Sequence, residues 1–454
     1  MTATTVEQRI LQRPYALTTL GSWSLVFLAA FESLAITTIM PVIATDLNGH
    51  GLYSLAFSAT LASGVVGTVA AGSWSDRRGP TVPLFVAIGI FTLGLAVAGT
   101  APSMEVFVAG RFLQGLGAGG ETVALYVLIA KVYPAGLHTR LFGAFAAAWV
   151  LPSLVGPFAA GVVTDVLSWH WVFLGVVALV AAATAMIGPA VRGLVHEPAG
   201  ARPGEGRRIV AAAAVAVAVV ALSYGAEVGR AAWVVAPLGI AVIVIAVRPL
   251  VPAGTYRVRP GLPATILLCA AAGAVFFGTE VYLPLLLHDR YGLPVWLNGI
   301  TLTAAAISWA LASHVQGRLS EQLSDSAAMR IGSALLASGA LTELLTAALR
   351  LHPVVAAAGW FLAGAGMGTL YPRVAALVLR LSAPGEEGFN VAAKGIADSV
   401  GGSVALALTG LLFGAGSFVT VFAVSTVIGV TVVLVARRTG PAAPAHRPLL
   451  PTRR

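Results

Sequence analysis

Charged residues are scarce in this sequence. They make up 10% of its 454 residues, whereas hydrophobic residues make up 58% and the mean hydropathy is +0.89. Ordinary soluble domains carry about 25% charged residues. The composition therefore excludes a soluble domain and predicts an integral membrane protein.

Cysteine and lysine are almost absent. Cys269 is the only cysteine and lies in an apolar run, which excludes a disulfide framework and a cysteine metal site. Lys131 and Lys394 are the only lysines. The net charge of +9 comes from basic residues scattered between apolar runs, so it does not indicate nucleic acid as a partner.

Several chemical signatures are also missing. There is no Gly-x-x-x-x-Gly-Lys phosphate loop, which argues against an ATP-driven pump. No two histidines have metal-ligand spacing, and no Ser/His/Asp arrangement stands out, so neither a metal, a cofactor nor an enzyme is expected. The first apolar run is too long for a signal peptide and is predicted to stay as a helix.

Long apolar runs are what the sequence has in abundance. A spanning helix needs about 20 apolar residues, and the runs predict about fourteen such helices. Their expected ranges are 17–44, 52–74, 82–101, 105–130, 140–163, 170–190, 209–225, 231–249, 263–287, 295–317, 328–350, 353–373, 391–413 and 417–436. The fold class is thus an all-α polytopic membrane protein.

The runs fall into groups of six, two and six. Residues 1–191 are predicted to form one six-helix bundle and residues 261–437 another. Residues 192–260 form a linker with two additional helices, and residues 438–454 a cytoplasmic tail. A twelve-helix arrangement, in which the middle pair belongs to a soluble linker, leaves the apolar runs 209–222 and 231–247 unexplained.

The distribution of basic residues predicts the topology. With both termini in the cytoplasm, about 23 of the 27 basic residues lie inside, as the positive-inside rule requires. Arg230, Arg290 and Arg350 fall outside, and Arg111 falls within a helix. We expect a multi-pass protein of the plasma (inner) membrane.

A short charged turn, Gly72-Ser-Trp-Ser-Asp76-Arg77-Arg78-Gly79-Pro80, separates the second and third predicted helices. Gly72 would let two helices approach closely, Asp76 would accept hydrogen bonds from a helix N-terminus, and Arg77 and Arg78 would hold the turn at the cytoplasmic headgroups. A degraded copy, Gly317-Arg-Leu-Ser-Glu321, occurs in the second half and indicates two repeated halves.

This turn resembles the loop between the second and third helices of major facilitator superfamily transporters. Gly72, Asp76, Arg77 and Gly79 match that family pattern, whereas Pro80 stands where a basic residue is common. The resemblance implies two six-helix bundles around a central cavity, with this turn as a cytoplasmic gate.

The fourth predicted helix opens with Arg111-Phe-Leu-Gln114-Gly115-Leu-Gly117-Ala118-Gly119-Gly120. The glycines predict close helix packing. An arginine within a membrane is costly and is expected to face a cavity or a partner; the alternative is that it extends to the outer headgroups. In related proton-coupled exporters the matching arginine is implicated in proton transfer.

The fifth predicted helix contains Gly156-Pro157 and Gly161, which resemble the superfamily's antiporter motif, although Pro152 and Ala160 replace two of its glycines. Gly156 and Pro157 are expected to bend the helix; a purely structural kink is the alternative. The following Trp169-His-Trp171-Val-Phe173 resembles a signature of the fourteen-helix drug:proton antiporters, with His170 in place of arginine.

Glu32, in the first predicted helix, precedes Pro41 by nine residues, which matches the acidic position of related fourteen-helix exporters. Burial near the midplane disfavours a charged carboxylate, so Glu32 is predicted to bind and release the coupling proton, with a neutral, hydrogen-bonded glutamic acid as the alternative. The other acidic candidates within helices are Glu121, Glu280 and Asp398, with Glu343 ranked below them.

These features predict a proton-coupled antiporter that exports lipophilic, often cationic drugs by alternating access, a function associated with antibiotic resistance. Its partners would be a small-molecule substrate, protons and the lipid bilayer, and we expect a monomer. Three alternatives remain: a dedicated exporter of one metabolite, lipid or antibiotic, a proton symporter, and a membrane sensor or enzyme without transport.

Overall fold

The computed structural model describes residues 10–12, 15–191, 204–224, 232–319, 322–383, 386–415 and 417–439. Within these ranges the regular structure is helical, and no strand occurs. The first half contains α1 (Ala16–Asp46), α2 (Tyr53–Arg78), α3 (Thr81–Gly99), α4 (Met104–Val132), α5 (Ala135–Val166) and α6 (His170–Val191). The predicted all-helical architecture is confirmed.

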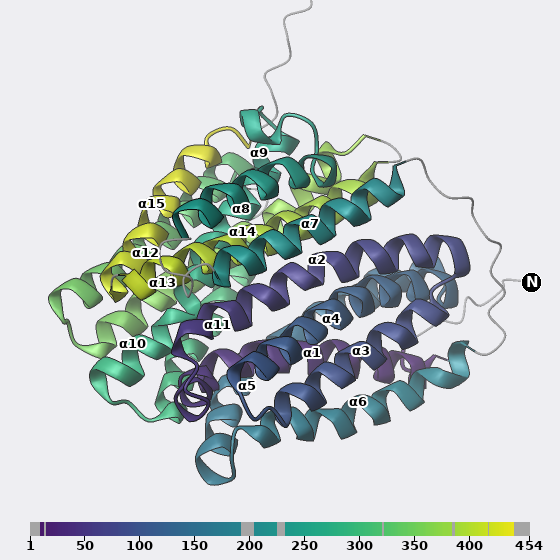
Figure 1. Cartoon of the computed structure of the whole chain (residues 1–454). Coiled ribbons are helices and arrows are strands. Elements are labelled where there is room, and N and C mark those ends of the chain that lie inside the picture. The colour runs from purple at the N-terminus through teal and green to yellow at the C-terminus, as the bar shows by residue number, and fades with distance from the viewer. Residues whose placement is uncertain are drawn as a thin grey trace, which may run out of the picture.

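The second half follows the same plan after two further helices. The two are α7 (Glu205–Tyr224) and α8 (Ala232–Val247), and then come α9 (Leu262–Glu280), α10 (Tyr282–Tyr291), α11 (Val295–Arg318), α12 (Asp325–Leu349), α13 (Pro353–Leu381), α14 (Glu387–Ala415) and α15 (Phe418–Ala436). Figure 1 shows the two halves as two groups of helices, purple to blue and green to yellow.

The two halves pack their helices in the same pattern. In the first half α1 packs on α5 and α6, α4 packs on α2 and α3, and α3 packs on α6. In the second half α9 packs on α14 and α15, α13 packs on α11 and α12, and α12 packs on α15. Each of these five contacts in one half therefore has its counterpart in the other, as expected for an internal repeat.

The halves meet along two seams, α5 against α11 and α2 against α14. The additional helix α7 lies along the second seam, where it packs on both α2 and α14 (Figure 1). α8 packs on α7. The predicted additional helices are therefore part of the helical body and not a separate unit.

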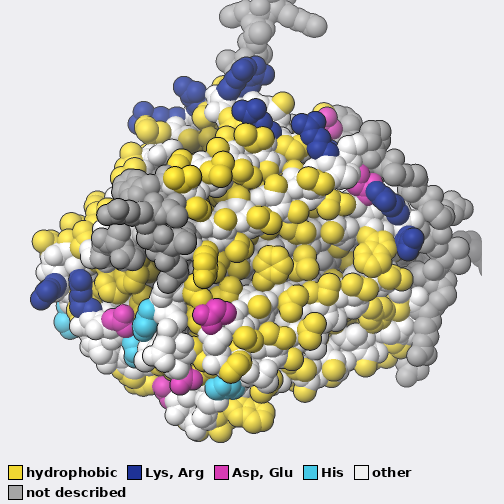
Figure 2. Space-filling view, in the orientation of Figure 1, with side chains coloured by type: hydrophobic (Ala, Val, Ile, Leu, Met, Phe, Trp, Pro, Cys, Tyr) yellow, Lys and Arg dark blue, Asp and Glu magenta, His cyan; other side chains and the backbone are white. Residues whose placement is uncertain are grey.

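Twelve of the described helices are long and apolar enough to cross a membrane. α8 has 16 residues, which span about 24 Å and fall short of a hydrocarbon core of about 30 Å. A count of fourteen spans thus stays a prediction. Figure 2 shows hydrophobic side chains across the middle of one face, with Lys and Arg side chains along its upper edge.

The predicted helix 263–287 differs in detail, because the structure divides it into α9 and α10. Val281 between them keeps helical dihedral angles, with φ −68° and ψ −36°. Pro284, in the first turn of α10, has no N–H to donate to the Glu280 carbonyl four residues earlier. The interruption thus lies directly beside a candidate acidic residue.

The helices run between two ends of the molecule, the Arg78 end and the Asp46 end. At the Arg78 end α2 finishes and α3 begins, and Gly79 makes the turn with a φ of 80° that favours glycine. At the Asp46 end α1 finishes and α2 begins. Because successive helices alternate in direction, the N-terminus of α1 lies at the Arg78 end.

Candidate functional site

Glu32 and Arg111 form an ion pair in the interior of the first half. The Arg111 Nη1 donates to Glu32 Oε1, which joins α4 to α1, and the two side chains are only 4% and 5% exposed. The same Nη1 donates to Gln114 Oε1 at 2.7 Å, and the Arg111 Nε donates to the Ala56 carbonyl of α2 at 3.4 Å. Arg111 therefore bridges three helices and does not extend to the surface.

Glycines of α4 bring its neighbours close enough for this pair. A Cβ at Gly115 would overlap the Thr60 carbonyl of α2, and a Cβ at Gly119 would overlap the Gly64 carbonyl. A Cβ at Gly117 would likewise overlap the backbone of Phe91 in α3. The close packing predicted for this glycine run is confirmed, and it fixes the depth at which Arg111 enters the bundle.

A second polar cluster lies in the other half, around Asp398 of α14. The Tyr371 hydroxyl of α13 donates to Asp398 Oδ1. The Lys394 Nζ lies 4.4 Å from the centre of the Tyr371 ring, and Trp309 of α11 packs on the same ring at 5.3 Å. A Cβ at Gly273 of α9 would overlap Asp398 Oδ1. Four helices therefore enclose this carboxyl group.

Tyr371 and Lys394 were not predicted from the sequence to belong to this cluster. A signal for Lys394 was present, because it is one of two lysines, lies within a predicted span and precedes Asp398 by four residues, one helical turn. No local pattern marks Tyr371, whose contact with Asp398 joins residues 27 positions apart.

The other candidate carboxyl groups are buried and separate from these clusters. Glu121 is 3% exposed, and its Oε2 has no hydrogen-bond partner among the described residues. Glu280 is 9% exposed at the end of α9. Glu343, which was ranked lowest, is fully buried with both oxygens unpartnered within the described part of the chain. A charge on any of these groups would be costly without a counter-ion.

The charged turn at the Arg78 end makes a contact that the sequence did not predict. Arg77 lies at the surface and donates to Glu205 Oε2 of α7 from both Nη2, at 2.7 Å, and Nε, at 3.2 Å. Gly72 leaves room for a Cβ, whose nearest neighbour would be Val123 at 3.6 Å. A Cβ at Gly67 would instead overlap the Leu116 carbonyl, so α2 lies closer to α4 at Gly67 than at Gly72.

In the second copy of the turn, Glu321 lies outside the described residues. The carboxylate that joins helices there is Asp325, the first residue of α12. It accepts from Arg373 Nη1 of α13 at 3.0 Å and also pairs with Arg380. Arg373 donates in addition to Gln316 Oε1 of α11 at 2.7 Å, so this end of the second half is held by charge as well.

The glycines of the fifth-helix motif lie on the seam between α5 and α11. A Cβ at Gly161 would come within 2.9 Å of the Trp296 Cα, and a Cβ at Gly299 of α11 within 2.6 Å of the Pro157 carbonyl. A Cβ at Gly156 would touch Phe31 of α1 at 3.4 Å. α5 is continuous through Pro157. These contacts join the two halves near the Asp46 end.

The seam between α2 and α14 is also closed at the Asp46 end. The Tyr53 hydroxyl of α2 donates to the Val281 carbonyl at 2.9 Å, and both groups are buried. A Cβ at Gly410 of α14 would overlap the Ser54 side chain. The two halves are therefore in direct contact at this end along both seams.

At the Arg78 end α7 connects the same two helices. It is bound to α2 by the Arg77–Glu205 pair and, near its other end, by a Ser58–Ser223 hydrogen bond of 2.9 Å. Its Arg208 lies over the ring of Phe389 in α14 at 4.7 Å. The described contacts place α7 as a bridge from the first half to the second.

The chain is similar to known membrane transporters. A family model described as Major Facilitator Superfamily matches residues 22–355. The probable multidrug-efflux transporter Rv1634 of Mycobacterium tuberculosis is 28% identical over 414 residues, which cover 85% of both chains. The Acurin A biosynthesis cluster MFS-type transporter of Aspergillus aculeatus is 33% identical over 147 residues, 32% of this chain and 26% of that protein.

Among solved structures, a POT family transporter in complex with a thioalcohol conjugated peptide has a similar fold. The TM-score is 0.68, and the match covers 92% of this chain and 94% of the other at 14% sequence identity. At that identity the likeness concerns the fold alone.

Proposed function

We propose, from the premise that this chain belongs to the major facilitator superfamily, that it exports lipophilic small molecules, cationic ones included, in exchange for protons. The chain is a multi-pass membrane transporter and not an enzyme. The observation that carries the proposal is the buried Glu32–Arg111 pair. Similarity to a multidrug-efflux transporter over most of both chains supports the substrate class.

The pair offers a way to exchange a proton for a cation. With Glu32 charged, its carboxylate pairs with Arg111. A proton on Glu32 removes the charge and releases the guanidinium, whereas a cationic substrate would compete with the guanidinium for the charged carboxylate. Proton and cation are therefore alternatives at one carboxylate, which is the requirement for exchange.

Losing one partner of a buried ion pair costs about 3–5 kcal/mol, because the other charge is left unpaired. Arg111 keeps two further acceptors, Gln114 Oε1 and the Ala56 carbonyl, when Glu32 is protonated. Those acceptors lower the cost of the protonated state. Glu121, Glu280 and Asp398 would supply a second proton site or pair the substrate.

Alternating access would use the two ends of the molecule. We propose that the direct contacts at the Asp46 end keep the outer side closed, while the Arg78 end opens to the cytoplasm. Asp76 and Arg77, together with Gly72 and Gly79, would form the cytoplasmic gate. Gly156, Pro157 and Gly161 would allow the halves to separate and reseal at the outer side.

The remaining organisation is proposed as the sequence predicts it. Residues 1–191 and 261–437 would move as two bundles, residues 192–260 would link them, and residues 438–454 would be a cytoplasmic tail. Both termini would face the cytoplasm at the plasma membrane, and the unit would be a monomer.

A dedicated exporter of one metabolite is the second candidate. It is favoured by the sequence match between 147 residues of this chain and a transporter of a biosynthesis cluster. That match covers only 26% of the other protein. A dedicated exporter would share the same helices and the same coupling pair, and it would differ in the range of substrates.

The test is proton-driven uptake of a panel of lipophilic cations into inside-out vesicles. The intact chain would be compared with Glu32→Gln, and with Glu105→Gln as a control, since Glu105 lies at the exposed start of α4. Uptake of several cations that is lost only in Glu32→Gln supports the proposal. Uptake that survives Glu32→Gln moves the proton site to Glu121, Glu280 or Asp398, and no uptake of any cation favours the dedicated exporter.

A further inference from the structure

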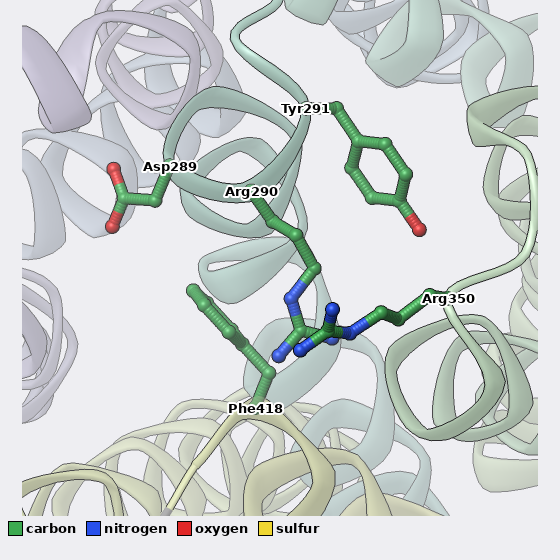
Figure 3. A pocket seen from close by; sticks show the side chains of 5 residues that line it. All are labelled: Asp289, Arg290, Tyr291, Arg350 and Phe418. Atoms are coloured by element: carbon green, nitrogen blue, oxygen red, sulfur yellow. The ribbon is translucent and has the colours of Figure 1, made fainter.

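A cavity of about 430 Å³ opens at the Asp46 end of the second half, and none of the acidic residues discussed above lines it. It is lined by Asp289, Arg290 and Tyr291 of α10, Arg350 at the end of α12 and Phe418 at the start of α15 (Figure 3). Its size lies within the range of small-molecule sites, about 300–1,000 Å³.

Two guanidinium groups converge in this cavity. Arg290 and Arg350 both line it, and Figure 3 shows their guanidinium groups overlapping in the view, while the Asp289 carboxylate points away from both. Within the described part of the chain, neither arginine forms an ion pair with a carboxylate. Two like charges in this arrangement repel each other, and an anion between them would remove the repulsion.

The arginines are held in place by their surroundings. Arg290 Nη1 donates to the Ala347 carbonyl of α12, and its guanidinium lies 5.5 Å from the centre of the Phe418 ring. The Tyr291 hydroxyl donates to the Leu351 carbonyl at 2.6 Å, which fixes the turn that carries Arg350. The site is therefore built before any ligand arrives.

Arg350 occupies an unusual backbone position. It ends α12 in the left-handed conformation, with φ 54° and ψ 44°, where glycine or asparagine is the usual residue. An arginine there carries a conformational cost, and such costs gather at functional sites. The conformation sends the side chain back over the cavity.

The topology gives the same indication independently. In the topology predicted from the basic residues, only Arg230, Arg290 and Arg350 fall on the outer side, and Arg230 lies outside the described residues. The other two meet in one cavity. Basic residues are disfavoured on the outer side, so their convergence calls for a local function.

We propose that this cavity binds a phosphate-class oxyanion at the outer face of the protein. Arginine recognises phosphate oxygens by paired charge-assisted hydrogen bonds, and two guanidinium groups would provide several donors to one group. The same chemistry fits the headgroup phosphate of an anionic lipid in the outer leaflet or a soluble phosphate. The proposal does not depend on the direction or coupling of transport.

The test measures binding of two probes to the purified full chain. In one arm inorganic phosphate is titrated at constant ionic strength into protein held in phosphatidylcholine nanodiscs. In the other arm retained phosphatidylglycerol is counted by native mass spectrometry after extraction from vesicles of phosphatidylcholine and phosphatidylglycerol. The variants are Arg350→Gln and Arg290→Gln, with Arg330→Gln as the matched control.

Arg330 is an exposed arginine near the other end of the same helix, so its replacement removes the same charge away from the cavity. Arg350 is exposed and its side chain makes no hydrogen bond within the described chain, so Arg350→Gln should fold as the intact protein does. Thermal unfolding of that variant verifies this. Arg290→Gln also removes the bond to Ala347, and for that reason Arg350→Gln is the decisive variant.

We expect both cavity variants to bind at least one probe about tenfold more weakly than the intact chain, because each loses a charge-assisted hydrogen bond. Arg330→Gln should bind that probe as tightly as the intact chain does. A loss confined to phosphatidylglycerol identifies a lipid headgroup, and a loss confined to phosphate identifies a soluble anion. The proposal is overturned if neither probe binds the intact chain, if Arg350→Gln binds both as tightly, or if Arg330→Gln loses as much.

Discussion

The Glu32 carboxylate of α1 accepts a hydrogen bond from the Arg111 guanidinium of α4, across 79 residues of sequence, and both side chains are buried. Buried ion pairs contribute little net stability when intact, but they are strongly destabilising when one partner is removed. The cost of removing one partner therefore distinguishes a paired carboxylate from an isolated one. This cost can be measured from protein stability, without any transport assay.

Arg111→Met is expected to destabilise the protein by about 3–5 kcal/mol, because Glu32 would be left charged and unpaired among apolar side chains. Adding Glu32→Gln should recover much of that loss, since the double variant contains no buried charge at this place. Unfolding midpoints of the single and double variants in one detergent measure the coupling. Additive losses in the double variant would show that the two residues do not act as a pair.

Gly115→Ala is expected to destabilise the first half by about 1–3 kcal/mol, because the new methyl group would overlap the Thr60 carbonyl and push α2 from α4. Gly89→Ala on α3 is the control, since nothing lies within 4 Å of its Cβ. There the substitution should stabilise the helix by about 0.5–1 kcal/mol. Opposite signs for the two variants in thermal unfolding support the close packing, and equal effects contradict it.

Gly299→Val is expected to weaken the closure at the Asp46 end. Its side chain would enter the space occupied by the Pro157 carbonyl, 2.6 Å from the Cβ position, and separate α11 from α5. A cysteine placed at Thr303, which contacts the Leu154 carbonyl of α5 at 3.4 Å, would report the separation by faster labelling with a maleimide. The native Cys269 is buried and should not react.

The control for that experiment is Gly175→Val in α6, where nothing lies within 4 Å of the Cβ. It should leave the labelling rate of the cysteine at position 303 unchanged. Labelling that is equally slow with valine at position 299 would show that the α5–α11 contact does not control access at this end.

The helices and their order were predictable from sequence, because twenty-residue apolar runs have few alternative structures in a membrane. The glycine run of α4 also predicted close packing on its own, since its spacing places glycines on faces that meet neighbours. Arg111 was predicted to face a cavity or a partner because an unpaired arginine in a membrane is costly. In each case a local pattern carried the physical constraint.

What the sequence did not reveal depends on residues brought together by the fold. The Tyr371–Asp398 hydrogen bond, the position of α7 along α2 and α14, and the convergence of Arg290 with Arg350 join segments with no shared pattern. The break at Val281 was foreseeable in part from Pro284, but a single proline is also compatible with an unbroken helix, as α5 shows at Pro157. Packing decides between the two outcomes.

The contacts of α7 lead to a final prediction. The first and last of the 20 residues from Ser58 to Arg77 in α2, and of the 19 residues from Glu205 to Ser223 in α7, lie about 27–29 Å apart along the helix. The two antiparallel helices are thus bound at both ends, and α7 should move with the first half. Its contact with α14, through Arg208 and Phe389, would then break and re-form as the Arg78 end opens.

Arg77→Gln tests this arrangement. Because the Arg77 side chain is 48% exposed, its pair with Glu205 should contribute less than about 1 kcal/mol to stability, and the unfolding midpoint should hardly change. If the pair is present in only one conformation, a free-energy change of that size is nevertheless enough to alter the population of that conformation by up to about fivefold. We therefore expect the maximal transport rate to change by up to this factor at unchanged substrate affinity. Arg78→Gln, which removes a neighbouring exposed charge, should leave the rate as it is. Equal rates in both variants would mean that the Arg77–Glu205 pair plays no part in the conformational cycle.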